Sequence, residues 1–129
     1  MEIESLLKKL RYRPGLRATI LNAPHEYEEA FTGLGFSRSL GTPKSQFTIL
    51  FVRNRVELDR HAAETIGGIE EDGLFWLVYP KGGSSIKSDL NRDIIWELMK
   101  PTGLKPVALV AVDDDWSAMR LRPEGKVKG

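Results

Sequence analysis

The sequence predicts one three-layer α/β domain, in which helices cover both faces of a mostly parallel sheet that ends in an antiparallel hairpin. Two observations support this fold class. Residues 47–52 and 74–79 are apolar runs without polar alternation, which is typical of strands buried on both faces of a sheet. Segments with helical spacing alternate with the strands, and this order favours parallel strands joined by right-handed crossovers. The last two strands are joined too tightly to be parallel and are expected to form the hairpin.

Four helices are expected where apolar residues recur at helical spacing. Pro24 suits the first turn of the second helix, because its missing N–H has no intrahelical partner there, and Gly35 ends that helix. Ser88 and Asp89 are both good N-caps for the fourth helix. The expected helices span residues 3–10, 24–34, 56–69 and 88–99.

Six strands are expected between and after these helices. Asp72 and Gly73 form a turn that opens the central apolar run. Residues 36–40 alternate in polarity, which indicates a short half-buried strand near the sheet edge. The tail, residues 123–129, has nothing to bury and is expected to fray. The expected strands span residues 17–21, 36–40, 47–52, 74–79, 107–112 and 116–122.

The composition limits the classes of function. The 129 residues fit a single domain spanning 1–129, and the net charge of +1 lacks the basic excess that general nucleic-acid binding needs. The absence of cysteine excludes disulfides and thiolate chemistry, and His25 and His61 are too few for a multi-histidine metal site. The N-terminus lacks the pattern of a secretory signal, and no apolar run approaches membrane-spanning length. We therefore expect a cytoplasmic protein without membrane contact.

Polar residues stand where the expected strands end. The carboxyl ends of parallel strands meet at one edge of an α/β sheet, and ligands bind along that edge. We therefore expect a crevice of mixed charge there, with Lys81, Asp89, Arg92 and Trp116 around it. The alternative is a solvated rim of ordinary ion pairs, which are common and individually weak. The strand-end residues expected at this edge are Asn22, Arg53, Asn54, Tyr79 and Lys81.

The segment after Lys81 has features of an anion-binding loop. Two glycines allow backbone N–H groups to converge, and Ser84, Ser85 and Lys87 add two hydroxyls and a charge before the next helix. The segment does not match the phosphate-loop pattern, so a flexible connection is the alternative.

Trp116 is the tryptophan that we consider for ligand stacking, because it stands beside three aspartates at 113–115. If the last strand runs antiparallel beside residues 74–79, this turn reaches the same edge of the sheet. The aspartates lack the alternating oxygen ligands and the glycine of a calcium loop. A turn held by its own aspartate side chains is therefore favoured over a cation site.

Several stretches of the chain resemble known proteins. The apolar strand after Asp72 and Gly73, the helix after it and the terminal hairpin resemble the second half of Rossmann-like methyltransferases. More narrowly, nearly the whole chain resembles a family of small uncharacterised bacterial proteins with a truncated domain of that kind, which implies a fold and no activity. This resemblance is carried by Pro14-Gly15, Leu21-Asn22-Ala23-Pro24, Asp72-Gly73-Leu74, Tyr79-Pro80-Lys81, Asp89-Leu90-Asn91-Arg92-Asp93 and Trp116-Ser117-Ala118.

Two contacts that the methyltransferases make with S-adenosylmethionine have no counterpart in this chain. Their first strand ends in a glycine-rich turn that lets the backbone approach the cofactor, but residues 21–26 contain no glycine. Their next strand ends in a carboxylate that holds the ribose, but here it ends at Leu40, Gly41 and Thr42. We therefore expect no cofactor.

These observations favour a degenerate methyltransferase-like domain that binds a small anionic ligand or a protein partner without S-adenosylmethionine. The alternative is an enzyme with a non-standard active site formed by Lys81, Asp89 and residues 113–116 at the carboxyl edge of the sheet. A third hypothesis is a nucleic-acid accessory protein, and the near-neutral net charge counts against it. That protein would use Arg53, Arg55, Lys81 and Lys87.

Overall fold

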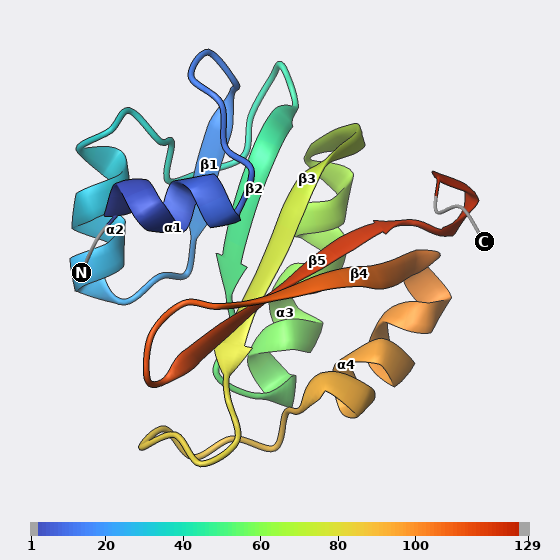
Figure 1. Cartoon of the computed structure of the whole chain (residues 1–129). Coiled ribbons are helices and arrows are strands. Elements are labelled where there is room, and N and C mark those ends of the chain that lie inside the picture. Colours follow the sequence, from blue (N-terminus) through green and yellow to red (C-terminus); the bar gives the residue numbers. More distant parts are fainter. Residues whose placement is uncertain (1–2, 127–129) are drawn as a thin grey trace.

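Five strands form one sheet in the computed structural model, which describes residues 3–126 (Figure 1). Their order is β1-β2-β3-β5-β4, so β3 is central and β4 lies at an edge. The strands are β1 (Ala18–Leu21), β2 (Ser45–Phe51), β3 (Ile69–Pro80), β4 (Leu104–Ala111) and β5 (Trp116–Pro123). The helices are α1 (Ile3–Lys9), α2 (His25–Thr32), α3 (Arg55–Gly67) and α4 (Arg92–Met99), with short 3₁₀ helices η1 (Lys100–Thr102) and η2 (Glu124–Lys126).

The sheet is mixed in direction. The pairs β1–β2 and β2–β3 are parallel, whereas β3–β5 and β4–β5 are antiparallel. The prediction of a mostly parallel Rossmann-like sheet is therefore wrong. After α4 the chain enters β4 at the sheet edge, and the tight turn after β4 brings β5 back between β3 and β4. Two expectations are confirmed: β2 and β3 are parallel neighbours, and the last two strands form an antiparallel hairpin.

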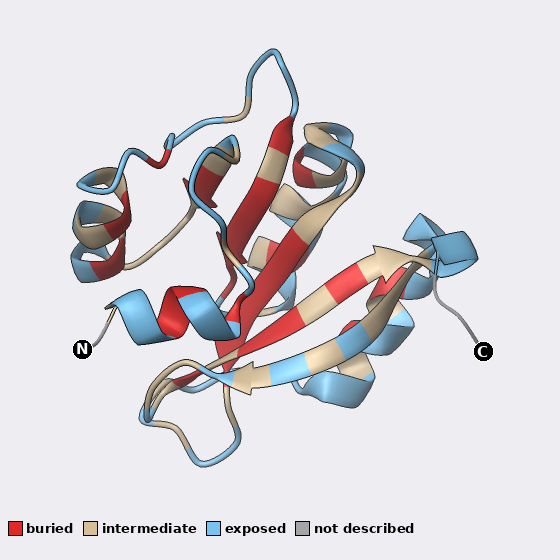
Figure 2. Cartoon of the chain, turned by 45° about the horizontal axis from the view of Figure 1, so that its top comes forward, coloured by how far each residue is buried: buried red, intermediate tan, exposed pale blue. Residues whose placement is uncertain are grey.

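Helices cover both faces of the sheet and divide the core into two halves. On one face, Leu10 after α1 and Phe31 of α2 pack with Phe47 of β2. On the other face, Leu58 of α3 and Ile95 of α4 pack with residues of β2 and β3. Because β2 and β3 are covered on both faces, consecutive side chains are buried, which explains their apolar runs. Figure 2 shows this continuous burial, and it shows alternating exposure along β4.

The strand β3 begins earlier than the sequence predicted. Asp72 and Gly73 were expected to form a turn before the strand, but they lie inside it, in a bulge. Ser45 of β2 pairs with Ile69 of β3, and the next pair joins Phe47 of β2 with Leu74 of β3. Between these two pairs β3 has more residues than β2, and the extra residues form the bulge. Asp72 has a φ of 54°, a left-handed conformation that aspartate tolerates better than most residues.

Two other segments differ from expectation. The strand expected at 36–40 is reduced to one parallel bridge between Ser37 and Thr19 of β1. Part of the tail expected to fray is ordered: Pro123 ends β5, and the N–H of Glu124 in η2 donates to the carbonyl of Gly103 at 2.8 Å. Residues 127–129 of that tail lie outside the described residues.

The start of α4 also differs from the prediction. Asn91 is the N-cap, and its side chain accepts a hydrogen bond from the N–H of Ile94 at 2.9 Å. The expectation that Ser88 or Asp89 caps this helix is wrong. Asp89 instead accepts a 2.9 Å hydrogen bond from the N–H of Arg55 at the start of α3. The loop before α4 is therefore tied to α3.

Candidate functional site

A hollow of about 460 Å³ opens at the carboxyl end of the central strand β3. Tyr79 lies at the end of β3, Lys81 follows that strand, and Arg92 is the first residue of α4. The β4–β5 hairpin borders the hollow on another side, and the hollow is open to solvent. The other lining residues are Gly82, Asn91, Asp93, Leu109 and Ser117. We call this site the β3 hollow, and its size suits a small molecule.

The β3 hollow carries more positive than negative charge. Lys81 and Arg92 contribute two positive charges to its wall, and Asp93 contributes one negative charge. Within residues 3–126, neither Lys81 nor Arg92 forms an ion pair. Cations that have no ion-pair partner are available to a ligand, so the wall favours an anion over a cation.

Tyr79 supplies a neutral hydrogen-bond donor to the β3 hollow. Its ring packs in the core with residues of α3 and α4, and the residue is 5% exposed. Burial raises the pKa of the Tyr79 hydroxyl, and the positive charge of Arg92 opposes this shift. The hydroxyl therefore stays protonated at neutral pH, so that it donates a hydrogen bond to an anion instead of repelling it.

The loop after β3 is held against the β4–β5 turn. The N–H of Lys81 donates to the carbonyl of Asp115 at 2.9 Å. The N–H and the hydroxyl of Ser85 donate to the Asp115 carboxylate at 3.1 and 2.9 Å. These hydrogen bonds lower the pKa of Asp115, and the charge of Lys81 lowers it further. The loop is therefore fastened to the hairpin and forms a fixed border beside the hollow.

The other polar residues of this loop do not line the hollow. The Ser84 hydroxyl accepts a hydrogen bond from the N–H of Ile86 at 2.8 Å, within the loop itself. Lys87 is exposed to solvent and lies outside the lining. Of the residues expected to form an anion-binding loop, the structure brings Lys81 and Gly82 to the hollow.

Asn22, Arg53 and Asn54 lie in a separate network at the ends of β1 and β2. The Asn22 amide donates to the carbonyl of Phe51 at 2.8 Å and to the Glu57 carboxylate at 3.0 Å. The same carboxylate accepts from the N–H of Arg53 at 2.9 Å, and Asn54 caps α3 by accepting from the N–H of Glu57. Burial alone would raise the pKa of Glu57, but the hydrogen bonds from Arg53 and Asn22 lower it. This network positions the start of α3.

Trp116 lies in the core on the α1 side of the sheet. It is 4% exposed, and its ring meets the Phe51 ring edge-on, with centroids 5.1 Å apart. The preceding turn is held by Asp113, whose carboxylate accepts from the N–H groups of Asp115 and Trp116 at 2.7 and 2.9 Å. The expectation that an aspartate side chain stabilises this turn is confirmed, and little of the Trp116 ring faces solvent.

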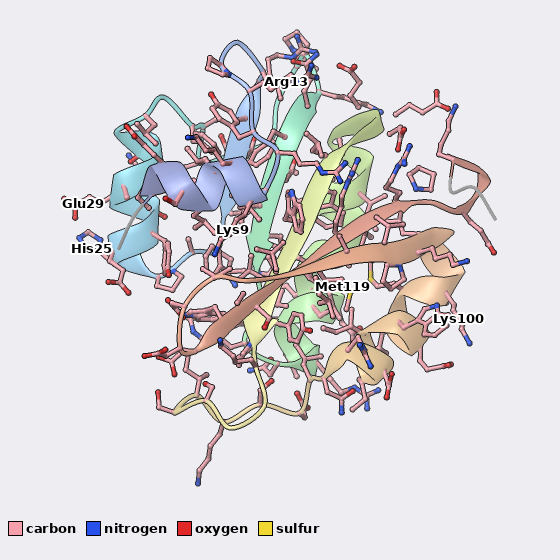
Figure 3. All side chains as sticks on the ribbon, in the orientation of Figure 1. Lys9, Arg13, His25, Glu29, Lys100 and Met119 are labelled. Atoms are coloured by element: carbon pink, nitrogen blue, oxygen red, sulfur yellow. The ribbon has the colours of Figure 1, made fainter. Side chains whose placement is uncertain are left out.

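The histidines lie away from the β3 hollow. His25 is on the outer surface of α2, 3.2 Å from Glu29 (Figure 3). His61, on α3, borders a different hollow beside Asn22. In the part of the chain that the structure describes, no cluster of histidine and acidic side chains is arranged to hold a metal ion. None of the helices between residues 3 and 126 has the length and apolarity needed to cross a membrane.

Sequence reasoning found the strand-end residues of the hollow and Arg92, but it missed the wall that the hairpin supplies. Ser117 faces the site because it stands directly opposite Tyr79 in the β3–β5 ladder. If the last strand is taken to run antiparallel beside β3, as the sequence allowed, Ser117 is placed at this edge. No local pattern marks Leu109, which comes from the edge strand β4.

No protein-family model matches the chain, and no curated protein matches its sequence. The resemblance to a family of small bacterial proteins therefore stays a prediction.

Proposed function

We propose that this protein is a binding domain for a small organic anion, which it holds in the β3 hollow. The observation that carries the proposal is the convergence of Lys81, Arg92 and Tyr79 on one hollow at the end of the central strand. The planar guanidinium of Arg92 matches the two oxygens of a carboxylate or phosphate, and Lys81 adds a point charge. The neutral Tyr79 hydroxyl completes the set of donors.

The hollow also offers an apolar surface. Leu109 is 46% exposed and lines the hollow together with Tyr79, whose ring belongs to the core. A ligand with an apolar or aromatic group beside its anionic group would cover this surface and gain hydrophobic stabilisation. We therefore propose an organic acid or a phosphorylated small molecule, instead of a bare inorganic ion.

A thermal-shift screen of organic acids and phosphorylated metabolites tests the proposal, because a ligand of the native state raises the melting temperature. Calorimetric titration of the best hit then measures affinity. Lys81→Gln and Arg92→Gln should each weaken binding by about tenfold. Lys87→Gln is the matched control: it removes an exposed lysine of the same loop outside the hollow and should leave affinity unchanged.

Two results would contradict the proposal. One is a screen in which no anionic compound raises the melting temperature. The other is a loss of affinity in Lys87→Gln as large as that in Lys81→Gln, which would place the site on the exposed loop.

A further inference from the structure

Three arginines gather on the opposite face of the sheet, on the side of α1. Arg120 of β5 stands directly opposite Trp76 of β3. Cross-strand partners share a face of the sheet, and Trp76 belongs to the half of the core that α1 covers. The indole N–H of Trp76 donates to the carbonyl of Leu10 at 2.9 Å, and Arg11 is the next residue. This bond fixes the end of α1 against β3, and the charge of Arg11 is close enough to Arg120 to lower the pKa of its guanidinium.

Arg11 has a backbone conformation that usually calls for glycine. Its φ is 64°, in the left-handed region. The N–H of Tyr12 donates to the carbonyl of Leu7 at 3.0 Å, and the N–H of Arg11 donates to the carbonyl of Lys8 at 3.1 Å. These bonds form a Schellman cap, in which the left-handed position is most often glycine. Arginine gains nothing from this backbone conformation, so a role of its side chain is the better explanation.

Arg120 has a hydrogen-bond donor without an acceptor. Its Nε is the buried side-chain nitrogen for which no hydrogen-bond partner exists within residues 3–126. Burial lowers the pKa of Arg120, and the neighbouring charges of Arg122 and Arg11 lower it further. A buried, unpaired donor on a charged group is costly, so a ligand that accepts from it would be favoured.

One carboxylate balances this group of arginines in part. Asp72 accepts two hydrogen bonds from Arg122, from Nε at 2.9 Å and from the terminal nitrogen at 2.7 Å. Asp72 therefore neutralises one of the three guanidinium charges, and two remain. Arg11 is exposed, and Arg120 and Arg122 are half-buried, so an ion from solvent can reach these arginines.

We propose that Arg11, Arg120 and Arg122 form a binding site for a dianionic oxyanion of the phosphate or sulfate type. Such an ion would accept the unpaired Nε–H of Arg120 and would balance the two remaining charges. Guanidinium groups suit tetrahedral oxyanions because they donate from several fixed directions. The site lies on the other face of the sheet from the β3 hollow and does not depend on it.

Titration of the full chain with inorganic phosphate, followed by the NMR signals of the arginine Nε–H groups, tests this site. Ionic strength is held constant with chloride. The Arg120 signal should shift and saturate, sulfate should reproduce the shift, and acetate should give a much weaker one. Arg120→Gln should weaken phosphate binding by about tenfold or more. Arg60→Gln, an exposed arginine of α3 on the far side of the sheet, should leave it unchanged.

Arg11→Gly separates binding from folding. Glycine suits the left-handed backbone, so the melting temperature should hold or rise while phosphate affinity falls. An Arg120 signal that does not respond to phosphate would overturn the site, as would an unchanged affinity in Arg11→Gly. The double variant Lys81→Gln/Arg92→Gln should keep the Arg120 shift. Loss of that shift would place the anion in the β3 hollow and would overturn a separate site.

Discussion

The hydroxyl of Tyr27 on α2 hydrogen-bonds to the carboxylate of Asp113 in the β4–β5 turn, 86 residues further along the chain. Tyr27 is completely buried, and its ring packs on Phe51 with centroids 5.3 Å apart. Burial raises the pKa of the Tyr27 hydroxyl far above its usual value, and the hydrogen bond to Asp113 adds to this shift. The hydroxyl is therefore always the donor, and it joins α2 to the hairpin.

Tyr27→Phe should lower the free energy of unfolding by about 1.5–3 kcal/mol, because it removes a hydrogen bond to a charged acceptor. Urea unfolding measures the change. Tyr12→Phe is the matched control, since the Tyr12 ring packs on Phe36 and Phe47 and its hydroxyl makes no side-chain hydrogen bond between described residues. Equal effects of the two variants would show that the Asp113 hydrogen bond adds nothing to stability.

The central position of β3 predicts a large effect of truncation. Leu77 has no exposed surface and packs in the half of the core under α3 and α4. Leu77→Ala should lower the free energy of unfolding by about 2–5 kcal/mol, through lost burial and the cavity that remains. Leu34→Ala, at a leucine that is 51% exposed, should change it by less than about 1 kcal/mol. A small loss at Leu77 would contradict its burial.

The ion pair of Asp72 and Arg122 predicts how stability depends on pH. The hydrogen bond from Arg122 lowers the pKa of Asp72 below its unfolded value of about 3.9. Such a carboxylate contributes stability above the unfolded pKa and loses it as the pH falls through the folded pKa. We therefore expect the free energy of unfolding to fall more steeply below about pH 4 in the wild type than in Asp72→Asn.

Asparagine is the suitable replacement at that position because it also tolerates the left-handed backbone of Asp72. Urea unfolding of both proteins over a series of acidic pH values makes the comparison. Curves that stay parallel down to the lowest pH would show that Asp72 has an ordinary pKa in the folded protein.

A substitution at Asn22 tests whether the network around Glu57 stabilises the fold without contributing to binding in the β3 hollow. Its φ is 56°, so Asn22→Gly keeps the backbone conformation and removes the hydrogen bonds to Phe51 and Glu57. Urea unfolding should show a loss of about 1–3 kcal/mol. Calorimetry should show unchanged binding in the β3 hollow. A fall in affinity like that of Lys81→Gln would instead place Asn22 at the ligand.

The buried strands could be predicted from the sequence, whereas the order and relative directions of the strands in the sheet could not. The apolar runs of β2 and β3 record burial on both faces, which is a local property of each strand. The position of β5 depends on long-range pairs, such as Met119 opposite Leu77 and Leu121 opposite Phe75. No pattern within residues 116–123 distinguishes a strand beside β3 from one at the edge.

The same limit applies to the site. Tyr79 and Lys81 were found because the end of a buried strand can be seen in the sequence. The sequence of the loop before α4 does not reveal whether its serine hydroxyls are available to a ligand. In the structure, Ser85 donates its hydrogen bonds to Asp115 of the hairpin. Trp116 likewise gives no sign in the sequence that it packs on Phe51.

The edge position of β4 leaves one side of its backbone without a strand partner, next to the exposed side chains of Val107 and Leu109. An apolar strand edge is a template to which another polypeptide can add, and it invites aggregation. Pro106 has no N–H to offer, and the ladder changes register between Pro106 and Ala108. A foreign strand therefore finds a regular edge only over the last residues of β4. Pro106 is therefore expected to disfavour the addition of a second chain along this edge.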